Sequence, residues 1–254
     1  MNILVTGSSY GIGRAVAEMF LKTGDNVIGI SRKPGTITNP RYTHVCADLS
    51  RKADIEKLVD NISGRIDVLI NNAGTAIARA GLEWSEEIFQ KIFNLNFIAP
   101  ITLLEAGRQN LAENAVIINI SSISDRIYGP GFALYSASKA ALNAYFGTLS
   151  LEYPSWKIIS LLPSCVDTPL LRGPHPDQKN FYENNNVDFS SLLTTNDIAR
   201  CIAVVIENKE NIPSGSRVIV INDDLKDDAK NPENLFVWNA TGQSLDRIRK
   251  NEIA

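Results

Sequence analysis

Two side chains capable of acid–base chemistry, Tyr135 and Lys139, stand four positions apart within residues 121–141. The pattern there predicts the end of a strand, a loop and then a helix, and residues four apart on a helix project from one face. A free phenol has a pKa near 10 and exchanges protons poorly at neutral pH. An ammonium about 4 Å away, at an effective dielectric of about 20, favours the phenolate by roughly 4 kcal/mol, or up to about three pKa units. Tyr135 could then act as a general acid or base, although the same spacing is also common in helices without chemistry.

A glycine-rich turn follows the first predicted strand. Residues 3–6 form a short β-branched run typical of a buried parallel strand, Gly7, Gly11 and Gly13 come next, and residues 14–22 have helical spacing. Between a strand and a helix, such glycines let the backbone approach a pyrophosphate at the helix N-terminus. The alternative is that they serve only a tight turn.

A second strand is predicted over residues 26–31, and it ends in Ser31-Arg32-Lys33. Dinucleotide folds that bind NAD place an acidic residue near this point, where it contacts the adenosine ribose. Here a cation stands instead, which favours NADP(H) over NAD(H) through contact with a 2′-phosphate. The alternative is a solvated Arg-Lys pair at the strand end.

Further strands and helices alternate along the chain, which predicts a single domain of the Rossmann type: a doubly wound α/β fold with about seven parallel strands. In such a sheet ligands bind beyond the carboxyl ends of the strands, where Gly7, Arg32, Asp48 and Asn72 would line one crevice. The remaining strands are expected at 42–47, 67–71, 116–121, 156–162 and 217–221. Helices are expected at 53–62 and 84–109, in the segment that carries Tyr135 and Lys139 and ends at about residue 152, and at 196–207, with Thr195 as a possible cap.

The helix predicted over residues 84–109 contains Asn94, Asn96 and Pro100. Two asparagines and a proline are unfavourable inside an apolar helix, so we expect a kink or a satisfied polar site there.

The composition indicates an ordinary globular protein: 254 residues, 44% hydrophobic and 21% charged, with a net charge of −3. That charge gives no reason to expect nucleic-acid or membrane partners. The three cysteines, Cys46, Cys165 and Cys201, are far apart in the sequence, and no leader or long apolar segment is evident. We therefore expect a cytoplasmic protein without disulfides, and neither His44 nor His175 has a spacing that suggests a metal site.

Residues 1–222 are predicted to form the dinucleotide-binding catalytic domain, with a substrate loop at about 169–195 that is polar, rich in proline and aperiodic. Residues 223–254 form a C-terminal tail whose apolar patch, Leu235–Trp238, is expected to cover the cleft or to lie at a subunit interface.

Together these motifs resemble the classical short-chain dehydrogenase/reductase family over about residues 2–222. Thr6-Gly7-x-x-x-Gly11-Ile12-Gly13 looks like its cofactor motif, and Asn71-Asn72-Ala73-Gly74 looks like its strand-four motif. Pro163-Ser164-x-Val166-x-Thr168 is similar to a third family segment. Four residues match the catalytic tetrad of the family in order and approximate spacing: Asn96, Ser122, Tyr135 and Lys139.

The resemblance implies a role for each tetrad residue. Tyr135 would protonate the carbonyl oxygen during reduction, and Lys139 would lower the pKa of Tyr135 and bond the nicotinamide ribose. Ser122 would hydrogen-bond the substrate oxygen, and Asn96 would hold a water that links Lys139 to solvent. The implied cofactor contacts are Gly7, Ser9, Tyr10, Gly11, Ile12, Gly13, Ser31, Arg32, Asp48, Leu49, Asn72, Ala73, Gly74, Tyr135, Lys139, Pro163, Val166 and Thr168.

The sequence departs from the family pattern in three places. Ser164 replaces a glycine, Tyr10 stands where many NADP-dependent members carry a basic residue, and Asn222-Asp223-Asp224 replaces a common Asp-Gly-Gly. Because Tyr10 is not basic, the preference for NADP(H) depends on Arg32 alone.

The resemblance implies an oxidoreductase that interconverts a carbonyl and a secondary alcohol, with a small-molecule substrate and a homodimeric or homotetrameric assembly. A nucleotide-sugar epimerase or dehydratase is a second possibility, but those relatives have a larger C-terminal domain and another glycine spacing. A third is a dinucleotide-sensing regulator without catalysis, since fold does not fix function; such sensors tend to lose catalytic residues, whereas all four are present here.

Overall fold

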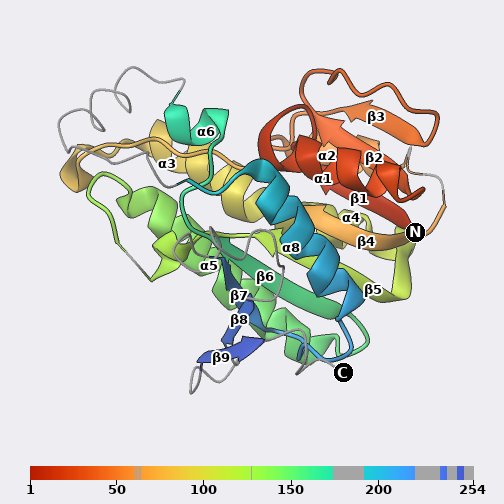
Figure 1. Cartoon of the computed structure of the whole chain (residues 1–254). Helices are drawn as coiled ribbons and strands as arrows, with labels where there is room; N and C mark the ends of the chain where they lie inside the picture. Colours follow the sequence, from red (N-terminus) through yellow and green to blue (C-terminus); the bar gives the residue numbers. More distant parts are fainter. Residues whose placement is uncertain are drawn as a thin grey trace.

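The computed structural model describes residues 1–60, 62, 64–126, 128–173 and 192–220, together with the backbone of residues 235–238 and 245–248. Its centre is one twisted sheet with strand order β3-β2-β1-β4-β5-β6-β7-β8-β9 (Figure 1). The first seven strands in chain order pair in parallel, which confirms the predicted sheet. Their bounds are β1 Asn2–Thr6, β2 Asn26–Ser31, β3 Tyr42–Cys46, β4 Ile66–Asn71, β5 Leu111–Ile120, β6 Lys157–Pro163 and β7 Arg217–Val220.

The strand order reverses at β1, with β2 and β3 on one side and β4 to β7 on the other. Connections from neighbouring strands therefore leave in opposite directions at this point, and in sheets of this kind the ligand crevice is expected beyond the carboxyl ends of β1 and β4. Gly7 and Asn72, the residues that directly follow these two strands, lie at this switch point.

Helices cover both faces of the sheet (Figure 1). α1 and α8 lie side by side on one face, and α2, α4 and α5 pack on the other. The helices are α1 Gly11–Lys22, α2 Lys52–Val59, α3 Glu86–Phe93, α4 Ala99–Ala106, α5 Ala133–Glu152, α6 Pro169–Arg172 and α8 Thr195–Glu207.

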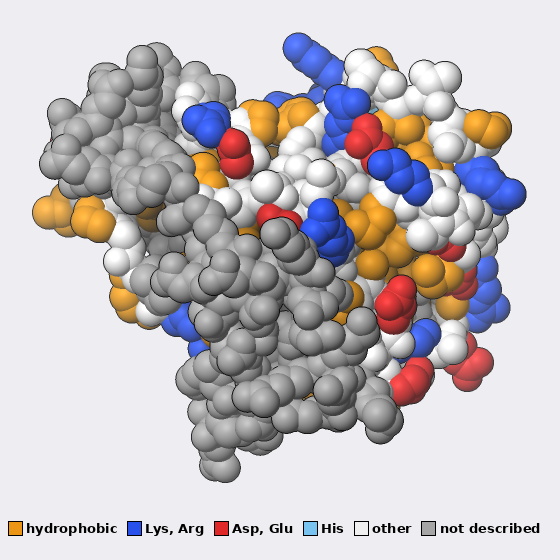
Figure 2. Space-filling model, viewed as in Figure 1, with side chains coloured by type: hydrophobic (Ala, Val, Ile, Leu, Met, Phe, Trp, Pro, Cys, Tyr) orange, Lys and Arg blue, Asp and Glu red, His pale blue; other side chains and the backbone are white. Residues whose placement is uncertain are grey.

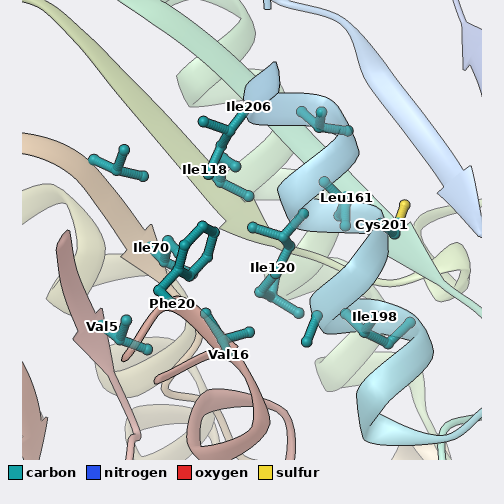
Figure 3. Close-up of a cluster of buried hydrophobic side chains, with 14 of the residues drawn as sticks. Val5, Val16, Phe20, Ile70, Ile118, Ile120, Leu161, Ile198, Cys201 and Ile206 are labelled. Carbon is teal, nitrogen blue, oxygen red and sulfur yellow. The ribbon is translucent and has the colours of Figure 1, made fainter. Parts of the chain in front are cut away.

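The core between the sheet and the pair α1/α8 consists of aliphatic side chains that alternate along the strands. Ile70, Ile118 and Leu161 point to this face and pack against Phe20 of α1 and Ile198 of α8 (Figure 3). Each is almost completely buried, and burial of one such side chain stabilises the fold by about 1.5–3 kcal/mol. The strands are thus held rigidly, which fixes the positions of the residues at their ends.

The helix predicted over 84–109 is a composite. α3 is followed by a π-helical segment, Asn94–Ile98, and then by α4, whose first turn accommodates Pro100. The proline therefore removes no hydrogen bond from a regular helix, and the wider π turn is the irregularity that the two asparagines predicted.

The predicted start of the helix at residues 196–207 is wrong by one residue. α8 begins at Thr195, and its cap is Thr194, not Thr195. The Thr194 hydroxyl accepts a hydrogen bond from the Asp197 amide (3.2 Å), while the Asp197 carboxylate accepts one from the Thr194 amide (2.8 Å). This reciprocal capping box satisfies two amides at once, which a cap at Thr195 would not do.

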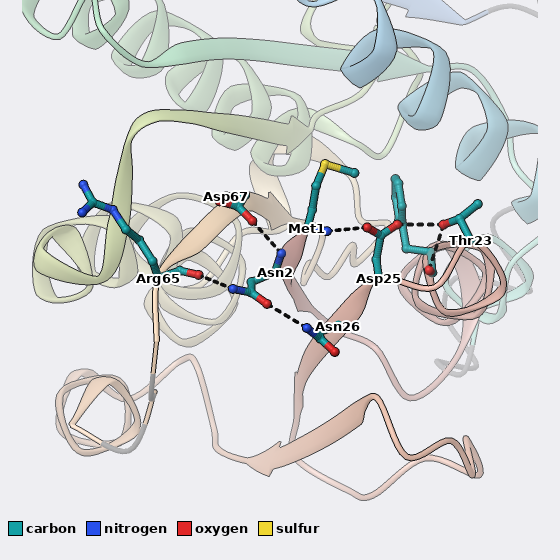
Figure 4. A network of polar contacts seen from close by, with 8 residues as sticks. Met1, Asn2, Thr23, Asp25, Asn26, Arg65 and Asp67 are labelled. Atoms are coloured by element: carbon teal, nitrogen blue, oxygen red, sulfur yellow. Dashed lines mark hydrogen bonds and ion pairs between the residues drawn. The ribbon is translucent and has the colours of Figure 1, made fainter.

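The amino ends of the strands are closed by ordinary polar contacts (Figure 4). The N-terminal ammonium of Met1 pairs with Asp25 at 2.6 Å, and the Asn2 amide donates to Asp67 at 2.7 Å. The Asn2 side chain donates to the Arg65 carbonyl and accepts from the Asn26 amide group. This network joins β1 to β2 and β4 at the edge opposite the crevice.

Two additional strands extend the sheet beyond the predicted seven. β8 (Leu235–Trp238) pairs antiparallel with β7, and β9 (Leu245–Ile248) pairs antiparallel with β8. The apolar patch of the predicted tail is therefore a strand of the sheet, and the rest of residues 221–254 lies outside the described residues.

The visible face of the described residues carries basic, acidic and hydrophobic side chains interspersed (Figure 2). No helix in the described part of the chain has the length and apolar character of a membrane span. Cys46, Cys165 and Cys201 are free thiols.

Candidate active site

The glycine turn between β1 and α1 requires glycine at three points. Gly7 and Gly11 have φ of 70° and 61°, which other residues rarely adopt. Gly13 is helical, but a Cβ added there would lie 2.5 Å from Asn72 Nδ2 and would overlap the Gly7 carbonyl. The turn is therefore packed directly onto the end of β4, and α1 starts at the rim of the crevice.

The first turn of α1 is free to hold an anion. Its N-cap, Tyr10, is extended, more than half exposed, and makes no side-chain capping bond. The amides at such a helix end point outward and carry partial positive charge, and they suit a pyrophosphate. The glycine cradle and the uncapped amides thus fit the phosphates of a dinucleotide.

Thr6, which the sequence did not single out as a site residue, joins the two halves of the crevice. Its buried hydroxyl accepts hydrogen bonds of 2.9 Å from the amides of both Asn72 and Ala73. The Asn72 side chain in turn donates to the Thr6 carbonyl at 2.8 Å. Thr6 is the first residue of the motif Thr6-Gly7-x-x-x-Gly11-Ile12-Gly13, and a hydroxyl at that place is the signal that could have identified its role.

The end of β2 presents two exposed cationic residues, Arg32 and Lys33. Arg32 is exposed at the strand end, whereas the Ser31 hydroxyl donates to the Lys33 carbonyl and contacts His44 Nε2, both at 2.8 Å. Ser31 and His44 therefore shape the strand end, and Arg32, the first residue after the strand, is exposed close enough to Asp48 to help lower the pKa of that carboxyl. At the end of β3, Asp48 holds Ser50 through its carboxylate, and Leu49 is buried in the core.

Tyr135 and Lys139 project from the first turns of α5, as predicted. The Lys139 ammonium lies 5.8 Å from the centroid of the Tyr135 ring and donates a 2.8 Å hydrogen bond to the Ile120 carbonyl at the end of β5. Lys139 is only 4% exposed, and burial lowers the pKa of its ammonium from 10.5 to about 8. At pH 7 the group is therefore still mainly charged, and its charge is poorly screened by water.

Asn96 is buried in the π-helical segment and clamps two elements together. Its Oδ1 accepts from the Thr75 amide at 2.8 Å, and its Nδ2 donates to the Thr75 carbonyl at 2.8 Å and to Ser138 Oγ at 3.0 Å. Ser138 then donates to the Tyr135 carbonyl at 2.7 Å. Asn96 thus lies in the site, joined to the backbone of Tyr135 through one hydroxyl, and the predicted water at Asn96 stays a prediction.

Gly74 lies between Asn96 and Lys139. A Cβ added to it would be 3.3 Å from Asn96 Oδ1 and 3.7 Å from Lys139 Nζ. The glycine therefore lets the strand-four turn approach both side chains closely.

Ser122 follows β5 by two residues and caps a 3-10 turn, Ile123–Asp125. Its hydroxyl accepts from the Ser124 amide and lies 3.1 Å from Ser124 Oγ. Because Lys139 bonds the Ile120 carbonyl, the end of β5 holds both Ser122 and the ammonium.

The end of β6 closes the crevice from the other side. The Thr168 methyl lies 3.8 Å from the position of a Cβ on Gly11, so this segment faces the glycine turn. Pro163 and Val166 are buried, and Thr168 caps α6 by accepting from the Leu171 amide. Residues 174–191, which include His175 and most of the predicted substrate loop, lie outside the described residues.

The geometry thus combines a glycine cradle with a tyrosine, a buried lysine, a serine and an asparagine at one sheet edge. Residues 1–179 match the family model described as short chain dehydrogenase. The chain belongs to the short-chain dehydrogenase family.

Two curated members of this family are similar over nearly their whole length. Carbonyl reductase [NADPH] 2 from Sus scrofa is 26% identical over 231 residues, 87% of this chain and 94% of the relative. D-erythrulose reductase from Gallus gallus is 28% identical over 228 residues, 85% of this chain and 92% of the relative. A solved short chain dehydrogenase family protein from Francisella tularensis subsp. tularensis SCHU S4 shares the fold, with a TM-score of 0.76 at 24% identity over 86% of this chain and 96% of that one.

Two residues of this short-chain dehydrogenase were missed by sequence reasoning, Thr6 and Ser138. Both are completely or nearly buried, and both use a small hydroxyl to join backbone segments of the site. Within the described ranges, no group of three or more His, Cys, Asp or Glu side chains is placed to hold a metal ion.

Proposed function

We propose that this protein is an NADP(H)-dependent oxidoreductase that interconverts a carbonyl and a secondary alcohol, with Tyr135 as the general acid and base. The observation that carries the proposal is the pairing of Tyr135 with the buried Lys139 on α5, beside a glycine cradle suited to a dinucleotide. The nicotinamide supplies the hydride when it is bound. The protein positions the reactants and handles the proton.

In the proposed reduction, Tyr135 donates its phenolic proton to the substrate oxygen. The Lys139 ammonium, 5.8 Å from the ring centroid, stabilises the phenolate that remains. At about 6 Å and an effective dielectric of about 20, this attraction amounts to roughly 3 kcal/mol. In the reverse direction the phenolate accepts the alcohol proton.

Ser122 is proposed to donate a hydrogen bond to the substrate oxygen. Its hydroxyl lies at the end of β5 and already contacts Ser124 Oγ at 3.1 Å, so a carbonyl oxygen that takes the place of Ser124 as acceptor would complete the site. Asn96 is proposed to keep the Tyr135 backbone in place through Ser138.

The proposed preference for NADP(H) depends on Arg32. It is exposed at the end of β2, the point where a dinucleotide fold places the adenosine ribose, and no carboxylate precedes it. The similarity to carbonyl reductase [NADPH] 2 from Sus scrofa also supports NADP(H). NAD(H) remains the alternative cofactor to be tested.

We also propose a homodimer or homotetramer in the cytoplasm. Trp84, Ile98 and Leu151, which are 57%, 45% and 77% exposed on or beside the helices α3, α4 and α5, would be covered in an assembly that pairs these helices. A single species with the mass of one chain in sedimentation at micromolar concentration would contradict the assembly.

The function is tested by binding first and turnover second. The melting temperature should rise with NADPH or NADH at equal concentration and should rise more with NADPH, because at equal concentration the ligand with the lower Kd stabilises the folded protein more. Turnover is then followed at 340 nm on a carbonyl panel that includes D-erythrulose. No shift with either nucleotide, and no turnover across the panel, would disprove the proposal.

A further inference from the structure

A buried carboxylate lies next to the proposed active site and has no role in the reaction described above. The Asp125 side chain is only 4% exposed, at the end of the 3-10 turn that Ser122 caps. A carboxylate is seldom buried unless charged or hydrogen-bonded partners compensate for its desolvation. The partners of Asp125 therefore indicate what holds this turn.

Those partners come from three elements. Asn143 Nδ2 of α5 donates to Asp125 Oδ2 at 2.9 Å, and Arg126 Nε, on the turn itself, donates to Oδ1 at 3.0 Å. Arg217 Nη1 of β7 lies 3.7 Å from Oδ2. The turn is thereby joined to a helix and to a strand that lie far from it in the sequence.

Asn143 stands four residues after Lys139 on α5, so both side chains project from one helical face. It is 2% exposed, and its Oδ1 has no hydrogen-bond partner among the described residues. Its orientation therefore depends on the bond to Asp125. The helix that carries Tyr135 and Lys139 is connected to the Ser122 turn through this bond.

Ser122 and Asp125 are the two ends of a single short turn. The Asp125 amide donates to the Ser122 carbonyl at 3.3 Å, and the Ser124 amide donates to Ser122 Oγ at 3.1 Å. A displacement of Asp125 relative to α5 would therefore move the Ser122 hydroxyl relative to Tyr135. A displacement near 1 Å in a catalytic arrangement can lower a rate by about a hundredfold.

We propose that Asp125 is a positioning residue, which holds the hydroxyl of Ser122 in register with Tyr135 through its bond to Asn143. This inference rests on the proposed function, because Ser122 and Tyr135 are the groups that it would align. Asp125 touches neither substrate nor cofactor in this account.

The decisive experiment exchanges the two partners. Asn143→Asp faces two carboxylates toward each other, and it should lower kcat by at least about tenfold while KM for NADPH stays within about twofold. The double variant Asp125→Asn/Asn143→Asp restores one amide and one carboxylate, and it should recover kcat to within about threefold of wild type. The assay uses NADPH with the carbonyl of the panel that reacts fastest, together with thermal melting of each variant.

Asp25→Asn is the matched control. Like Asp125→Asn in the double variant, it removes a carboxylate from an ion pair, but at the amino ends of the strands, and it should leave kcat unchanged. If Asn143→Asp lowers only the melting temperature, or if the double variant regains stability without kcat, the positioning role is wrong.

A readout that needs no substrate separates this inference from the proposed function. Asn143→Ala should speed hydrogen exchange at the Ser124 and Asp125 amides at least about tenfold, while the amides of β1 keep their rates. Unchanged exchange at the turn would overturn the inference even if carbonyl turnover is found. If wild type turns over no carbonyl but the turn amides respond, the proposed function fails and the coupling between turn and helix stands.

Discussion

The two ends of the parallel strands are built differently. At the amino ends, Met1, Asn2 and Asp25 satisfy one another or nearby groups in short polar contacts (Figure 4). At the carboxyl ends the chain uses left-handed glycines and buries Lys139, whose ammonium donates a hydrogen bond to the Ile120 carbonyl.

The two ends of the strands contribute differently to the stability of the fold. The amino ends carry contacts that favour folding, each worth little at a partly exposed position. The carboxyl ends carry groups that folding alone disfavours, such as an ammonium whose pKa burial has lowered to about 8. Substitutions at the two ends should therefore separate activity from stability.

Tyr135→Phe should have the largest effect, a loss of at least about a thousandfold in kcat/KM, because both the acid and base roles depend on the phenolic proton. The measurement is steady-state turnover, with NADPH affinity followed separately by thermal shift and expected to change little. Tyr153→Phe removes a hydroxyl at the far end of the same helix and is the matched control. Full turnover by Tyr135→Phe would contradict its role as acid and base, whereas a variant without turnover that keeps full biological activity would favour a non-enzymatic sensor.

Lys139→Met should lower kcat by about a hundredfold, since the proposed stabilisation of about 3 kcal/mol for the phenolate is lost. The same substitution should not destabilise the fold at neutral pH, because it removes an ammonium that burial disfavours. The folded pKa of about 8 lies below the ordinary 10.5, so the unfolded chain binds more protons between these values. The unfolding free energy of wild type therefore gains up to about 3 kcal/mol as pH rises from 8 to 10.5.

Lys139→Met lacks that gain, because methionine does not titrate. Urea unfolding at pH 7.5 and at pH 10 gives the free energy of unfolding of both proteins. At the higher pH the value for wild type should rise relative to the value for Lys139→Met. Parallel pH dependence of the two proteins would show that Lys139 is not buried as an ammonium.

Gly13→Ala should weaken NADPH binding by at least about tenfold and destabilise the fold by about 1–3 kcal/mol, because the new methyl overlaps the Gly7 carbonyl. Gly147→Ala is the control: it lies in α5 with nothing within 4 Å of the added atom. That control should gain about 0.5–1 kcal/mol of stability. Isothermal titration with NADPH and urea unfolding provide the two measurements, and equal behaviour of the two variants would refute the close packing of the glycine turn.

Arg32→Ala should weaken NADPH binding by about tenfold and leave NADH binding nearly unchanged, because only the 2′-phosphate loses a charged contact. Lys33→Ala, the adjacent cation, is the matched control and should have the smaller effect. Equal losses for both nucleotides would remove the argument for NADP(H).

Asp25→Asn should have the smallest effect, a loss of no more than about 1 kcal/mol in the free energy of unfolding, since the ion pair with the Met1 ammonium is partly exposed. Chemical denaturation at low and high salt checks this value. A change in turnover would contradict the separation between the two ends.

The sheet and most site positions followed from the sequence because they depend on local signals. The β-branched runs predicted the strands, and the glycines before α1 predicted the turn that requires positive φ at Gly7 and Gly11. Tyr135 and Lys139 were placed by helical spacing alone, and the structure brings them onto one face of α5.

Other features depend on contacts between distant segments, which a single sequence does not reveal. The irregular turn around Asn96 was expected, but its clamp on Thr75 joins residues 21 positions apart. The bond between Asp125 and Asn143 joins a loop to a helix. The pairing of β8 with β7 depends on an edge that exists only once the sheet has formed.

The position of β1 in the sheet has a consequence for how the chain folds. β1 is the first strand of the chain, yet it pairs with β2 on one side and β4 on the other. One edge of this apolar strand therefore stays open until residues 66–71 arrive, and the non-local pairing slows folding. A chaperone that binds unpaired apolar strands would protect β1 until β4 is available to pair with it.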